Sequence, residues 1–128
     1  MCILQGCLGQ QPTKNDIIGV WIAEDGGRFS FEADGSFTSE NLSGSKIFSG
    51  FANYDGMNFS ESGNWELKDA SGGSIVSLNS RKSEKLQGSF STQLTVSGEG
   101  LLGNKPPWRL FAWIGDPDDM NKYEFKKQ

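Results

Sequence analysis

The sequence predicts an all-β protein, a single small antiparallel barrel of about eight strands. The length of 128 residues is that of one ordinary domain, which can bury a modest core without crosslinks. Its 17 glycines and 9 phenylalanines favour short strands joined by tight turns over helices. Apolar residues recur at alternate positions in about eight segments, the period of a half-buried strand. A closed barrel with that many strands has an interior just filled by side chains, or able to hold one small ligand.

The first strands are expected in the N-terminal third of the chain. Residues 18–22 alternate, with Trp21 on the opposite face from its apolar neighbours. Residues 24–27 then supply turn chemistry, because aspartate and glycine adopt the backbone angles that tight hairpins need. Residues 29–31 carry two alternating phenylalanines, and a second turn leads into Phe37. This region therefore predicts three consecutive antiparallel strands.

The remaining strands are expected in five segments, which are residues 62–68, 74–80, 89–97, 107–114 and 123–125. The fourth of these is apolar on both faces near its end, as a central or barrel-closing strand is. Three large side chains in these strands are expected in the core: Trp21, Trp65 and Trp113.

The N-terminus is interpreted apart from the barrel, with residues 1–16 as a flexible tether and residues 17–128 as the domain. The stretch from Leu4 to Cys7 is similar to a bacterial lipobox, in which cleavage precedes a cysteine that becomes lipidated, and a polar stretch follows it. Met1 lies too close to Cys7 for a basic and hydrophobic leader. Either the given sequence begins inside a longer precursor, or the match is accidental.

Composition argues against several classes of function. The net charge is −4 with no basic stripe, which makes nucleic acid an improbable partner. The sequence has no histidine, and its only cysteines, Cys2 and Cys7, precede the first strand. Clusters of cysteine and histidine that bind metals are thereby excluded, and so is the commonest general base. We expect a monomer without catalytic residues, metal or cofactor, and with no helical membrane span.

A weak internal repeat pairs Gly19-Val20-Trp21 with Gly63-Asn64-Trp65, each followed by a turn rich in aspartate and glycine. A glycine just ahead of a large aromatic residue on a first strand resembles the Gly-x-Trp signature of lipocalins and other calycin-like barrels. In that family the tryptophan plugs one end of the barrel. From residue 17 onward the chain also resembles a group of small uncharacterised bacterial lipoproteins, which implies export and a barrel-like fold but no catalytic residues. The alternative is two ordinary hairpins with buried tryptophans.

Residues 43–60 form a glycine- and aromatic-rich link that is longer than a hairpin turn. Long links of this kind are usually functional or mobile, and aromatic residues contribute large contacts to interfaces. The candidate binding residues are Phe48, Phe51, Tyr54 and Phe59, together with Trp108 on a stiff rim after two prolines. The alternative is that residues 47–51 form another strand whose aromatic residues cover a barrel end, and that Trp108 simply begins a strand.

Residues 116–119 carry three carboxylates in four positions, which suits calcium. The spacing lacks the alternating ligands of an EF-hand loop, however, and an aspartate before proline is common in turns. We therefore favour a plain turn.

Three functions from different classes stay open. The first is an exported module of the cell envelope, either periplasmic or at the cell surface, that binds another protein as an inhibitor or immunity-type factor; this is by analogy of fold alone. The second is a calycin-like carrier of a small apolar ligand, which would need smaller residues facing the interior. The third, an enzyme, lacks candidate groups.

Overall fold

Eight antiparallel strands close into a barrel in the computed structural model, which confirms the predicted fold class. The structure describes residues 11–47, 58–70, 73–80, 91–99, 105–114, 118 and 121–128. The barrel strands are β1 (Gly19–Ala23), β2 (Arg28–Phe31), β3 (Ser36–Glu40), β6 (Ser62–Ala70), β7 (Gly73–Ser80), β8 (Ser91–Glu99), β9 (Lys105–Trp113) and β10 (Lys122–Lys127). The smaller elements are α1 (Lys14–Ile17), β4 (Leu42–Ser43), α2 (Gly44–Ile47) and β5 (Asn58–Phe59).

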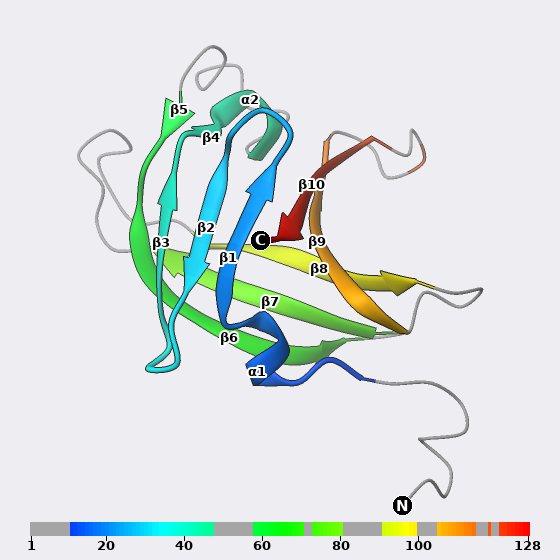
Figure 1. Ribbon diagram of the computed structural model, residues 1–128. Helices are drawn as coiled ribbons and strands as arrows, with labels where there is room; N and C mark the ends of the chain where they lie inside the picture. Colours follow the sequence, from blue (N-terminus) through cyan, green and yellow to red (C-terminus); the bar gives the residue numbers. More distant parts are fainter. Residues whose placement is uncertain are drawn as a thin grey trace, which may run out of the picture.

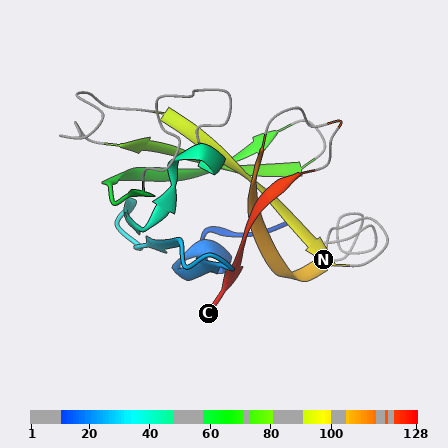
Figure 2. The ribbon, with the colours of Figure 1, turned by 90° about the horizontal axis from the view of Figure 1, so that it is seen from above.

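The order of strands around the barrel is β1-β10-β9-β8-β7-β6-β3-β2, so the last strand of the chain closes onto the first. In that closing pair Trp21 lies opposite Lys127 and Ala23 lies opposite Phe125. Figure 2 shows β10 curving round to meet the N-terminal part of the chain. The helices α1 and α2 lie at opposite ends of the barrel (Figure 1), and we name these ends the α1 end and the α2 end.

Large aromatic side chains fill much of the interior. The Phe29 ring lies 5.0 Å from that of Phe125, and the Phe31 ring lies 5.3 Å from that of Trp65, both in edge-on geometry that favours aromatic pairs. The described core also contains aliphatic residues from the opposite wall, which are Val76, Leu78, Leu94, Val96 and Leu110. Since each strand alternates between an inward apolar face and an outward face, the alternation in the sequence produces this packing.

The helix α1 begins with a local network in which the Asp16 carboxylate accepts hydrogen bonds from the backbone N–H of Thr13 at 2.7 Å and from its hydroxyl at 3.1 Å. Ile17 ends the helix fully buried in the core. The expected tether ended at residue 16, whereas α1 crosses that boundary. The helix therefore joins the last three residues assigned to the tether to the first residue of the domain, and of these Ile17 is the one buried in the core.

The two Gly-x-Trp repeats lie at one level of the barrel. Gly19 pairs with Phe31, Phe31 with Phe37, and Phe37 with Gly63, so the two glycines end a single row across four strands. The indole N–H of Trp21 donates to the carbonyl of Ile17 at 2.8 Å. That of Trp65 donates to the carbonyl of Glu32, in the β2–β3 turn, at 3.0 Å. The repeat thus places two buried tryptophans that close the α1 end.

Trp113 differs from the expectation of a core position. The inward residues of β9 are Trp108, Leu110 and Ala112, which leaves Phe111 and Trp113 on the outer face. Trp113 is half-buried there, with its ring 5.0 Å from that of Phe111. The Lys122 ammonium lies 4.3 Å from the Phe111 ring centre and 5.2 Å from that of Trp113. Trp113 therefore belongs to an aromatic pair outside the barrel. It is five residues from Trp108, and an odd spacing along a strand places the two side chains on opposite faces.

Candidate functional site

The predicted binding residues fall into two groups. Phe48, Phe51 and Tyr54 lie outside the described residues. Phe59 and Trp108 are 1% and 8% exposed and belong to the core, so neither is the exposed aromatic residue of a protein-binding surface that the sequence predicted. Trp108 faces inward because it shares a strand face with Leu110, which corrects its expected place on an exposed rim. Phe59 is buried in β5, opposite Leu42 of β4.

The elements β4, α2 and β5 hold the base of the segment that carries those aromatic residues. Leu42 pairs with Phe59 and Ser43 pairs with Asn58, so the chain leaves and returns at the same place. Ile47, the last residue of α2, is 9% exposed and belongs to the core. The alternative strand over residues 47–51 therefore does not begin at Ile47, and its other residues lie outside the described chain.

Asp25, in the β1–β2 turn, connects this base to the barrel. Its Oδ1 accepts hydrogen bonds from the backbone N–H of Gly27 at 2.9 Å and from the Tyr123 hydroxyl at 3.1 Å. Its Oδ2 forms an ion pair with the Lys46 ammonium at 3.2 Å. The ammonium also lies 5.2 Å from the centre of the Tyr123 ring, within range of a cation–π interaction. One carboxylate therefore joins a turn, the helix α2 and the strand β10.

Tyr123 is the central member of this network. It is 3% exposed, and its hydroxyl oxygen accepts a hydrogen bond from the backbone N–H of Ser43 at 3.2 Å while its O–H donates to Asp25. A Cβ added at Gly27 would collide with the Tyr123 hydroxyl oxygen. Glycine at position 27 therefore leaves the space that the hydroxyl occupies. We call Asp25, Lys46, Tyr123 and the Ser43 N–H the anchor network.

The network changes the acidity of two of its members in opposite directions. Burial raises the pKa of Tyr123 to about 12; the Ser43 N–H partly offsets this, and the nearby Asp25 charge adds to it. Burial also acts to raise the pKa of Asp25, but the hydrogen bonds from Gly27, Lys46 and Tyr123, together with the Lys46 charge, outweigh it and lower that pKa. Near neutral pH the network thus holds a charged carboxylate and a neutral phenol.

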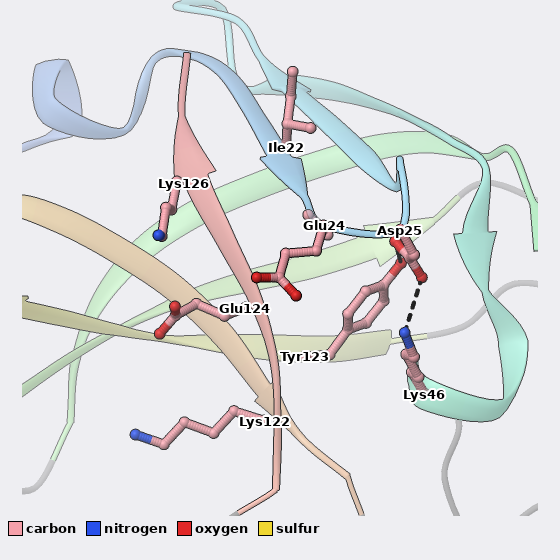
Figure 3. Close-up of a pocket in the computed structure, with 9 residues that line it drawn as sticks. Ile22, Glu24, Asp25, Lys46, Lys122, Tyr123, Glu124 and Lys126 are labelled. Carbon is pink, nitrogen blue, oxygen red and sulfur yellow. Dashed lines mark hydrogen bonds and ion pairs between the residues drawn. The ribbon is translucent and has the colours of Figure 1, made fainter.

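A hollow of about 380 Å³ lies beside the anchor network. Four residues of β10 line it, and Figure 3 shows Glu24 and Glu124 among the lining side chains, with Tyr123 and Lys46 below Asp25 in this view. The lining residues are Ile22, Ala23, Glu24, Asp25, Lys46, Lys122, Tyr123, Glu124 and Lys126. This mixture of both charges suits polar contacts and hydrogen bonds at a surface, rather than the enclosure of an apolar molecule.

Sequence reasoning missed the anchor network. The turn around Asp25 was identified, but the role of its carboxylate depends on Tyr123, which lies 98 positions later and meets it only when β10 closes on β1. The aspartate followed by two glycines was the one local signal, since such a side chain often binds the N–H two residues on.

Other predicted features are only partly within the described chain. Cys7 lies outside it, and so do residues 116, 117 and 119 of the acidic turn, whereas Asp118 is described and exposed. Across the described ranges, no group of three or more histidine, cysteine or acidic side chains is arranged to hold a metal ion. No helix in the same ranges is long and apolar enough to cross a bilayer.

Fold and site together define a small antiparallel β-barrel protein with an anchored segment at one end, an architecture compatible with a calycin-like fold. Comparison with known protein families, with curated proteins and with solved structures gave no match.

Proposed function

We propose that this chain is an exported binding module that recognises another protein, acting as an inhibitor or immunity-type factor, and that its contact surface lies at the α2 end. The observation that carries the proposal is the anchored base of the segment between β4 and β5. Binding residues are often placed on segments held by a rigid scaffold, because less conformational entropy is then lost on association.

The packing at that base supports the proposal. Leu42 and Phe59 are each 1% exposed, and both belong to the same core cluster as the barrel interior. The Ser43 N–H and the Lys46 ammonium add polar ties to Tyr123 and Asp25. The aromatic residues Phe48, Phe51 and Tyr54 follow directly on this base, and large aromatic side chains supply much of the energy of protein interfaces.

The described interior supports a protein partner over a small apolar ligand. The rings of Trp21, Phe29, Phe31 and Phe125 are at most 1% exposed and fill space that a carrier keeps open for its ligand. We therefore rank the calycin-like carrier second and assign binding, rather than catalysis, to the chain. Cys7 as a lipid anchor and a place in the cell envelope belong to the same proposal and rest on the similarity to a lipobox.

Site-specific photo-crosslinking in the native envelope tests the proposal. A photoreactive phenylalanine analogue replaces Tyr54 in one variant and Glu66, exposed on β6, in a matched control. We expect one discrete adduct at position 54 and none at position 66. The purified partner should then bind the Phe51→Ala variant with a loss of about 2 kcal/mol while the stability of the variant is unchanged. Adducts of equal yield at both positions, or none at either, would contradict the proposal.

Fractionation tests the envelope location separately. The Cys7→Ser variant should move from the membrane to the soluble fraction, whereas Cys2→Ser should stay with the membrane. If both variants fractionate like the wild type, attachment through Cys7 is wrong, and the binding proposal is unaffected.

A further inference from the structure

We propose a second binding site at the α1 end of the barrel, for a small organic anion with a flat apolar body, of the class of the aromatic carboxylates. A hollow of about 340 Å³ lies there between α1, β9 and the end of β10. Its lining residues are Asp16, Trp21, Pro107, Trp108, Arg109, Lys126 and Lys127. The volume falls within the range of small-molecule sites. The site goes beyond the proposed function, because none of its lining residues belongs to the anchor network, although Lys126 also borders the hollow beside that network.

The hollow is electropositive in a chain whose net charge is −4. The Lys127 ammonium donates to the backbone carbonyl of Asp16 at 2.9 Å and lies 5.9 Å from the centre of the Trp21 ring, so it has neutral partners and no ion pair. Lys126 forms no ion pair or hydrogen bond with any residue that the structure describes. Arg109 is paired, with Glu99 at 2.9 Å. Two cationic side chains are therefore available to an anion.

The one acidic group in the lining does not cancel this charge. The Asp16 carboxylate is turned to the start of α1, where its Oδ2 accepts two hydrogen bonds from Thr13. Interactions between a carboxylate and lysine ammonium groups are charge-assisted and stronger than neutral hydrogen bonds. A neutral or cationic ligand would leave both lysines unused, so the charges favour an anion.

The walls of the hollow are flat and apolar, and they offer one further donor. The exposed ring of Pro107 and the 8% exposed indole of Trp108 line it, whereas Trp21 borders it but is fully buried and offers no surface to a ligand. The Trp21 indole N–H is already bonded to Ile17, but no hydrogen bond in the described ranges engages the indole N–H of Trp108. Those ranges contain no buried side-chain nitrogen or oxygen without a partner, so this N–H reaches solvent, and the hollow is the open space that Trp108 lines.

The position of Trp108 is fixed before any ligand arrives. At Gly98 a Cβ would lie 2.7 Å from Cζ3 of Trp108, so the indole packs directly on the backbone of β8, beside the register shift between Ser97 and Glu99. A ring held by strand backbone keeps its N–H in place, and such preorganisation lowers the cost of binding. The carboxylate would lie near Lys126 and Lys127, with the flat body of the ligand against Trp108 and Pro107.

Titration of the folded protein with phenylacetate, followed through the tryptophan indole N–H signals in ¹H–¹⁵N spectra, tests the site. The Trp108→Phe variant assigns the reporting signal. We expect a saturable shift of the Trp108 signal with a dissociation constant on the order of a millimolar, while the Trp65 signal, bonded to Glu32, stays in place. Phenylacetamide has the same ring without the charge and should give no saturable shift.

Two variants and one control locate the charge requirement. Lys126→Gln should weaken phenylacetate about threefold, and the double variant with Lys127→Gln about tenfold. Lys122→Gln is the matched control, because Lys122 lies on the same strand outside this hollow, and it should bind like the wild type. If Lys127→Gln disturbs α1, the single Lys126→Gln variant still decides the question. The proposal is overturned by an equal response to phenylacetamide, by no saturable shift, or by wild-type affinity in Lys126→Gln.

Discussion

The two ends of the barrel are closed by different interactions. At the α1 end the buried closing contacts are made by uncharged groups, with Ile17 and Trp21 fully buried and the indole N–H groups of Trp21 and Trp65 bonded to backbone carbonyls. The charged groups there, Lys14 and Lys127, lie over the two tryptophan rings. At the α2 end Asp25, Lys46 and Tyr123 form a network that contains ionisable groups. Burial of large rings resists changes of pH, whereas a hydrogen bond between a phenol and a carboxylate does not. The comparison predicts that the α1 end is held mainly by buried rings and that the stability of the α2 end responds to pH.

The largest effect is expected from truncation at the α1 end. Trp21→Ala should lower the free energy of unfolding by about 3–5 kcal/mol, because removal of a fully buried indole leaves a cavity and a carbonyl without its donor. Denaturation in urea, followed by circular dichroism, measures the loss. Trp113→Ala is the control, and its cost should be roughly half or less, since that ring is half-buried on the outer face. Equal losses would show that burial in the barrel does not distinguish the two tryptophans.

The next effect is a loss of stability at high pH that depends on Tyr123. Its pKa is raised to about 12, above the value of about 10 for an unfolded tyrosine. The stabilisation is therefore fully present below pH 10 and is lost as pH rises towards 12, by roughly 2–3 kcal/mol. The Tyr123→Phe variant should not show this additional loss of stability between pH 10 and 12. The matched control is Tyr54→Phe, which changes the only other tyrosine and should retain it. If both variants lose stability in parallel between pH 10 and 12, Tyr123 is not responsible.

An effect of intermediate size is expected from a substitution that fills the space around the Tyr123 hydroxyl. Gly27→Ala should destabilise the fold by roughly 1–2 kcal/mol, because its Cβ would collide with that oxygen. The added Tyr123→Phe change should recover part of the loss, which a double-mutant cycle measures as a coupling energy. Gly73→Ala is the control, since a Cβ there meets no atom within 4 Å. Additive losses in the double variant would indicate that the two residues are not in contact.

The smallest effect is expected at acid pH. The pKa of Asp25 is lowered in the folded state, so its contribution is present above the unfolded value of about 4 and is lost as pH falls through the folded value. Asp25→Asn should lower stability at pH 7 by about 1 kcal/mol and should reduce the decline below pH 4. Asp69→Asn, at an exposed position of β6, should change neither. If the stability of Asp25→Asn declines below pH 4 as steeply as that of the wild type, Asp25 is not the source of the acid sensitivity.

Local alternation predicted the strands well, because the period of a strand depends only on neighbouring residues. Residues 62–68, 74–80 and 107–114 were expected as strands, and β6, β7 and β9 cover nearly the same positions. The same alternation predicts that Trp108 points inward, because Trp108 and Leu110 are two residues apart and lie on the same face of the strand. The interpretation of Trp108 as an exposed rim residue gave more weight to the two prolines before it than to this alternation. The short elements α1, α2, β4 and β5 were missed because each is too short to show a period.

The sequence by itself determined the fold class, the approximate strands and the turns with aspartate and glycine, since these follow from composition and from contacts along the chain. Tertiary structure alone decided the closure of β10 on β1, and with it the meeting of Tyr123 with Asp25 and of Lys127 with Trp21. It also decided the pairing of β4 with β5, which anchors the proposed binding segment. These contacts join residues far apart in the chain, and their register is selected by the packing of the whole core rather than by any local pattern.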